Sequence, residues 1–76
     1  MRKHDRVVLS SDLSEEGLQA GDVGTIVHIY PHGEAFEVEF VALNGETVAV
    51  VTIKSGQIRA VREGEITHAR ALLAPA

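Results

Sequence analysis

The segment from residue 17 to residue 30, GLQAGDVGTIVHIY, constrains the fold of this chain most strongly. Its three glycines permit positive φ angles and a close approach to a neighbouring backbone. Asp22, inside the turn, is suited to accept hydrogen bonds from nearby amides. The residues after Gly24 are mostly β-branched or aromatic, as in a strand. Apolar side chains fall on both faces, Ile26 on one and Val27 on the other, so we predict a glycine turn leading into a bent or bulged strand.

Residues 35–53 predict an antiparallel hairpin whose register can be counted. Between residues 36 and 40, large apolar side chains alternate with Glu37 and Glu39, the pattern of a strand with one buried face. Asn44 and Gly45 favour a two-residue type I′ turn, which needs positive φ at both positions. The apolar pairs that follow are Phe40 with Ala49, Val38 with Val51, and Phe36 with Ile53. A slip of one residue would bury the glutamates, so the register is strongly specified.

Five short strands are predicted, at residues 6–9, 24–30, 35–41, 47–53 and 58–61. The long loop after the first strand is expected to be anchored by Leu13 and Leu18, which should point inward. Short strands with tight links describe a mainly β protein, a small five-stranded SH3-like barrel. In such a barrel the first and last strands are antiparallel neighbours. We assign residues 1–62 to this barrel.

The alanine- and leucine-rich residues 63–76 predict a C-terminal helical tail of the same domain. Ile66, Ala69, Leu72 and Leu73 recur at near-helical spacing. A helix of roughly ten residues is not stable alone, so it must dock on its own barrel or on another chain. If its apolar stripe is exposed, or crosses to another chain, the tail is an interface.

Composition narrows the classes of function. The chain has 76 residues, no cysteine and a formal net charge of −4. The absence of cysteine excludes disulfides, thiolate metal ligands and a cysteine nucleophile. The acidic balance disfavours nucleic acid, whose binding rests on neutralising phosphates. No apolar run approaches the roughly 18 residues of a membrane span. We therefore expect a cytoplasmic protein that needs no membrane and no cofactor.

Neither of the two clusters of ionisable side chains indicates catalysis. The four histidines are too scattered to form a structural zinc site, which usually takes four ligands. Glu37 and Glu39 share one face of a strand, but on an open sheet they lack the cleft in which paired carboxylates perform acid–base chemistry. They are better suited to a solvated acidic face, or to a docking patch for a basic partner. We therefore predict that the chain is not an enzyme.

Three short runs, GDVGT, EVEF and AVVTI, occur together in this chain. In this combination the sequence resembles the uncharacterised bacterial domain-of-unknown-function family 4926, from about Asp5 to Leu73. The resemblance implies an SH3-like barrel and brings no established activity and no catalytic residues. Some members are encoded beside another small protein, in the style of toxin and antitoxin pairs, which implies a protein partner.

The first strand, glycine turn and second strand are also similar to the KOW motif of ribosomal and transcription-factor proteins, which can contact RNA. If the first and last strands are neighbours, positive side chains gather on one side of the barrel. The residues that would bind nucleic acid are Lys3, Arg6, Arg59 and Arg62.

Two hypotheses follow. The leading one is a non-enzymatic protein-interaction module that binds another protein, or a second copy of itself through the tail helix. Its candidate partner-binding residues are Glu37, Glu39, Ile66, Leu72 and Leu73. The alternative is a KOW-like nucleic-acid binding domain that uses the four cations named above.

Overall fold

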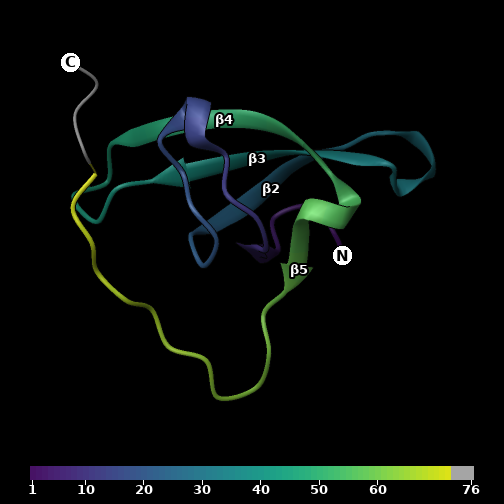
Figure 1. The fold of residues 1–76 in the computed structure, drawn as a ribbon. Helices are drawn as coiled ribbons and strands as arrows, with labels where there is room; N and C mark the ends of the chain where they lie inside the picture. The colour runs from purple at the N-terminus through teal and green to yellow at the C-terminus, as the bar shows by residue number, and fades with distance from the viewer. Residues whose placement is uncertain (73–76) are drawn as a thin grey trace.

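The computed structural model describes residues 1–72, which form five strands and three short 3₁₀ turns. The strands are β1 (Arg6–Leu9), β2 (Val23–Ile29), β3 (Ala35–Val41), β4 (Thr47–Lys54) and β5 (Ile58–Ala60). The turns are η1 (Ser14–Glu16), η2 (Pro31–Gly33) and η3 (Ser55–Gln57). All five strands belong to one antiparallel sheet with the order β4-β3-β2-β1-β5 (Figure 1). The prediction of a mainly β protein with five strands is therefore confirmed.

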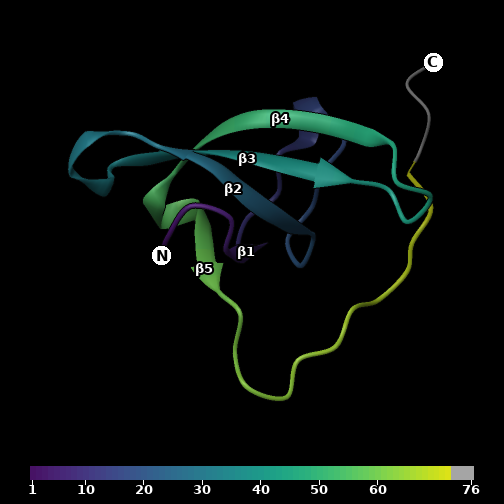
Figure 2. The same ribbon diagram turned by 180° about the vertical axis from the view of Figure 1, so that it is seen from behind.

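The sheet does not close into a barrel, so the five antiparallel strands of the predicted SH3-like barrel are present but its closure is not. β1 pairs with β2 on one side and with β5 on the other, as predicted for the first and last strands. β4 and β5, at the two ends of the strand order, do not pair with each other. The η3 turn sends the chain sharply from β4 into β5, and Figures 1 and 2 show β5 running across the direction of β3 and β4. Strands that cross in this way cannot share a ladder of hydrogen bonds.

The glycine turn and the bulge that follows it agree with the sequence. Gly21 has a φ of 95°, which favours glycine. A Cβ on Gly24 would lie 2.5 Å from Cγ1 of Val38 and 3.0 Å from the carbonyl oxygen of Glu39, so only glycine lets β2 press against β3 here. Further along β2 the register shifts between Ile26 and His28, as the mixed apolar pattern predicted.

The β3–β4 hairpin has the predicted register along most of its length. Five consecutive pairs are confirmed, including the three apolar ones: Phe36 with Ile53, Glu37 with Thr52, Val38 with Val51, Glu39 with Val50, and Phe40 with Ala49. The predicted two-residue type I′ turn is wrong. Ala42 accepts a hydrogen bond from the Gly45 N–H at 2.8 Å and donates its own N–H to Glu46 at 2.8 Å, which makes a three-residue loop. In that loop only Gly45 has a positive φ, 93°.

A second irregularity compensates for the longer loop. Next to the turn Val41 pairs with Thr47, one residue short of the predicted partner, whereas Phe40 pairs with Ala49 as predicted. Val48 is therefore the extra residue of a bulge, and its side chain packs partly against the core. The bulge restores the register that keeps the glutamates out of the core.

The core is a single apolar cluster under the sheet. Its buried members are Val7, Leu9, Leu18, Ile26, Phe36, Val38, Phe40, Ile53 and Ile58. Leu18 is buried and Leu13 packs against the cluster, so the loop after β1 is anchored as predicted. No helix within residues 1–72 is long and apolar enough to cross a membrane.

The C-terminal tail corrects the predicted helix. After β5 the chain makes a turn at residues 63–64 and then runs without regular secondary structure to residue 72. Figures 1 and 2 show it leaving β5 in a wide arc that ends near the β3–β4 hairpin. The helix prediction is therefore wrong for this part, and Leu73 lies outside the described residues. Ile66 is 92% exposed, so the apolar stripe gains no docking surface that would stabilise so short a helix.

Candidate functional site

An open groove of about 560 Å³ lies between the tail and the end of the sheet. Leu18, Phe40 and Val48, at the edge of the core, contribute to its lining. One wall is the tail, residues 66–70 with Leu72. The facing walls are the glycine turn, residues 21–25, and the end of β3 with the hairpin turn, residues 39–43. Segments far apart in sequence thus meet at one concave surface.

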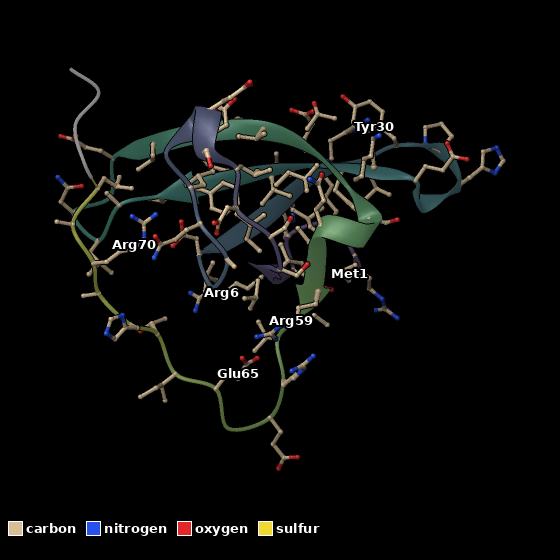
Figure 3. All side chains as sticks on the ribbon, viewed as in Figure 1. Met1, Arg6, Tyr30, Arg59, Glu65 and Arg70 are labelled. Carbon is tan, nitrogen blue, oxygen red and sulfur yellow. The ribbon has the colours of Figure 1, made fainter. Side chains whose placement is uncertain are left out.

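The tail is attached to the glycine turn by Arg70. Its guanidinium donates to both carboxylate oxygens of Asp22, from Nε to Oδ1 at 2.9 Å and from Nη2 to Oδ2 at 2.5 Å. The Nη2 group also donates to the carbonyl oxygen of Gly17 at 3.2 Å. Asp22 and Arg70 have side chains that are only 18% and 24% exposed. Figure 3 shows Arg70 reaching from the tail toward the body of the sheet.

This pair stays charged at neutral pH. Burial alone would raise the pKa of Asp22, but hydrogen bonds from Arg70 and from the Gln19 N–H, with the Arg70 charge, hold that pKa below its ordinary value. The hydrogen bond to Asp22 raises the pKa of Arg70 in turn. The predicted role of Asp22 as an acceptor within the turn is confirmed by the bond from Gln19 at 2.9 Å.

A second ion pair holds the start of the tail. Arg59 of β5 donates to Glu65 through both terminal nitrogens, at 2.9 and 2.7 Å, and the two side chains face each other in Figure 3. Glu65 also accepts the Arg62 N–H at 2.6 Å. The Arg59 hydrogen bond and then the Arg62 N–H lower the pKa of Glu65 to about 2. The tail is thus held at two residues five positions apart, with an exposed stretch between them.

Of the predicted acidic pair, only Glu39 lies in the groove. Glu39 lines the groove and accepts a hydrogen bond from the Thr47 hydroxyl at 2.9 Å. Glu37 is not in the groove and accepts hydrogen bonds from the hydroxyls of Tyr30 and Thr52. Figure 3 places Tyr30 at the opposite end of the sheet from Arg70. Both carboxylates are half-buried and hydrogen-bonded to neighbours on the sheet, so they act partly as structural acceptors.

The tail residues Ile66 and Leu72 do line the groove, as partner-binding candidates should. Val41 and Leu43, which were not predicted, line it from the hairpin side and are 47% and 89% exposed. A signal for Leu43 was present, because a large apolar residue stands beside Asn44 in a turn that usually carries polar residues. The groove therefore has exposed apolar side chains on both walls.

The predicted cation cluster is only partly assembled. β1 and β5 are neighbours, with Val8 opposite Arg59, so the strand adjacency on which the cluster depended is present. Arg59, however, is engaged by Glu65, and Arg6 instead lines the groove. Lys3 and Arg62 are exposed. Binding of nucleic acid through these residues stays a prediction.

The four histidines lie on different segments of the chain. His28 packs edge-on against Tyr30, with ring centroids 4.8 Å apart, and His68 lines the groove. Among the residues that the structure describes, no three His, Asp or Glu side chains are arranged to hold a metal ion.

Comparison with known proteins identifies a family. The family model "Domain of unknown function (DUF4926)" matches residues 3–60. No curated protein and no solved structure matched the chain. The matched range covers all five strands, including the glycine turn and the β3–β4 hairpin, whereas the tail follows it. Because the match spans more than half of the 76 residues, the chain belongs to the domain-of-unknown-function family DUF4926.

Proposed function

We propose that this chain is a non-enzymatic protein-interaction module and that the groove between tail and sheet is its docking surface. The observation that carries the proposal is the pair of apolar side chains on opposite walls, Leu43 at 89% and Ile66 at 92% exposure. Exposed apolar side chains that rim a concave surface are typical of a binding site. Covering one such side chain contributes roughly 1.5–3 kcal/mol, so a partner that covers both gains substantial affinity.

The ionisable groups in the groove support binding rather than catalysis. Asp22 and Arg70 neutralise each other, and Glu39 accepts a hydrogen bond from Thr47. Charged groups that are already paired serve to position a partner and to select for it.

The partner we propose is a small protein encoded by a neighbouring gene, in the style of a toxin and antitoxin pair. A small partner suits a small surface, because the groove has a volume of only about 560 Å³. A compact contact of this size places most of its binding energy in a few central side chains. Leu43 and Ile66 are the residues of this chain best placed for that role.

The test is co-purification of the tagged full chain from its native cell at native expression. We expect one protein to be retained in stoichiometric amount, and Leu43→Ser or Ile66→Ser to reduce retention about tenfold, equivalent to roughly 1.4 kcal/mol. Val61→Ser is the matched control, because Val61 is 47% exposed but does not line the groove. Equal retention by all four proteins would contradict the proposal.

The same experiment examines the KOW-like alternative. Recovery of RNA that is released by salt, and that is lost in the double variant Arg6→Glu with Arg62→Glu, would favour a nucleic-acid binding domain instead. Arg62 is the better second position, because changing Arg59 would also release Glu65.

A further inference from the structure

We infer that Asp22 and the carbonyl of Gly17 form an arginine-recognition site, which Arg70 of the tail occupies in the free protein and an arginine in an extended segment of the partner occupies in the complex. This inference rests on the proposed function and specifies its partner's chemistry.

The receptor half of the site is built without the tail. Asp22 accepts the Gln19 N–H through Oδ2 at 2.9 Å, and its own N–H donates to the Gln19 carbonyl at 3.0 Å. The turn is locked to β1, because Leu9 donates its N–H to Asp22 at 2.8 Å and accepts the Gly21 N–H at 2.8 Å. All these residues lie in the family-matched range 3–60. The carboxylate is therefore held in position by the domain itself.

The second acceptor is placed by the neighbouring turn. Gly17 follows η1 with a φ of 72° and donates its N–H to the Ser14 carbonyl, and its own carbonyl accepts from Arg70. The carboxylate and this carbonyl together accept three hydrogen bonds from one guanidinium. A planar guanidinium satisfies this arrangement, whereas a lysine ammonium cannot make the two-pronged contact with the carboxylate.

The tail is a weakly held occupant. Within residues 65–72 only Arg70 makes side-chain hydrogen bonds to the glycine turn. The apolar side chains of the same segment gain little burial, since Ile66 is 92% and Leu72 41% exposed. The segment has no helix or strand bonds of its own to lose. A competing segment that offers the same arginine and buries more apolar surface therefore displaces it.

The ligand is thus an extended segment that carries an arginine with a bulky apolar side chain close by. The arginine replaces Arg70, and the apolar side chain covers Leu43, which lines the groove and is exposed. The formal charge of −4 on the chain favours the approach of a basic segment.

The test uses the full chain with Arg70→Ala as receptor and a synthetic peptide with the sequence of residues 64–72 as probe. Binding is followed by the amide NMR signals of Gly17, Gln19 and Asp22. We expect these signals to shift, with at least tenfold weaker binding to the wild-type chain, in which Arg70 competes for the site. We expect a similar loss for a peptide with lysine in place of arginine, and for the receptor Arg70→Ala with Asp22→Asn. Dispersed signals from β1 to β5 verify that each receptor is folded.

Three results would overturn the inference: no shift of these signals in a folded receptor, equal binding of the lysine peptide, or equal binding after Asp22→Asn. A wild-type dimer that dissociates on Arg70→Ala would also overturn it, because the tail would then exchange between copies.

The proposed function is tested separately from this inference. If the peptide fails while partner retention still depends on Leu43, the inference is wrong and the function stands. If the peptide binds but no variant changes retention, the site binds arginine without serving the proposed groove.

Discussion

The β3–β4 hairpin and the C-terminal tail were both predicted from the spacing of apolar residues, and only the hairpin agrees with the structure. In the hairpin the alternating side chains of Phe36, Val38 and Phe40 are buried, and each pairs with the predicted residue of β4. In the tail Ile66 is almost fully exposed, and the segment is not helical. An apolar pattern therefore predicts structure reliably only where the rest of the chain provides a surface to cover it.

The difference has a physical cause. The inner face of β3 meets β1, β2 and the loop at Leu18, which together fill one core. The tail lies outside that core, at the end of the sheet, and is bonded there through Arg70 to the carboxylate of Asp22. Two charged contacts, at Glu65 and Arg70, hold the tail instead of an apolar face. Such contacts fix single residues without imposing a helical repeat.

The largest expected effect contrasts one isoleucine from each region. Ile53→Ala removes a fully buried side chain from β4 and should lower the free energy of unfolding by about 2–5 kcal/mol. Ile66→Ala should change it by less than about 0.5 kcal/mol, because that side chain is exposed. Urea denaturation followed by circular dichroism measures both. A comparable loss from both variants would mean that the tail is part of the cooperative core.

A smaller effect is expected where β2 presses on β3. Gly24→Ala places a Cβ 2.5 Å from Val38 and 3.0 Å from Phe40, and the overpacking should cost about 1–3 kcal/mol of unfolding free energy. Gly56→Ala is the control, because no atom lies within 4 Å of its added Cβ. Equal denaturation midpoints for the two variants would show that β2 and β3 move apart at Gly24 without a measurable loss of stability.

Acid should separate the two regions. The pKa values of Asp22 and Glu65 are lower in the folded protein than their ordinary values of 3.8 and 4.5, so the unfolded chain binds more protons in acid. The stabilisation they contribute is therefore complete above those ordinary values and is lost as the pH falls through the lowered ones, toward about 2 for Glu65. We expect the amide signals of residues 65–70 to reach coil positions in this range while β3 and β4 stay dispersed. Loss of native amide signals from residues 65–70 and from β3 and β4 at the same pH would contradict the expectation that the tail is released first.

The smallest effect concerns the exposed ion pair at the start of the tail. Arg59→Gln should leave the denaturation midpoint unchanged, since ion pairs in water contribute little. It should still return the pKa of Glu65 toward 4.5, which a carbon-13 titration of the carboxyl group detects. Arg62→Gln is the control, because the variant keeps the backbone N–H that Glu65 accepts, so the pKa should move less. Identical titrations for the wild type and Arg59→Gln would show that Arg59 does not pair with Glu65 in solution.

Sequence by itself determined the parts of this protein that depend on near neighbours and on alternation. It predicted the glycine turn, the bulged strand after it, five strands and the hairpin register, because the backbone freedom of glycine and the two-residue period of a strand act locally. It did not predict the three-residue turn, since the Val48 bulge that compensates for it leaves the register of the core unchanged. Of the residues that line the groove it found Arg6, Glu39, Ile66 and Leu72 but neither Val41 nor Leu43.

Only the tertiary structure decided the path of the tail and the existence of the groove. The contact that sets both joins Asp22 to Arg70 across 48 positions of sequence. In the sequence Asp22 resembles an ordinary turn residue and Arg70 an ordinary solvated residue of a short helix, because neither neighbourhood encodes the other. Folding of the sheet brings the glycine turn to the place where the tail passes, and only then does the charge pair outweigh the weak helical preference of so short a segment.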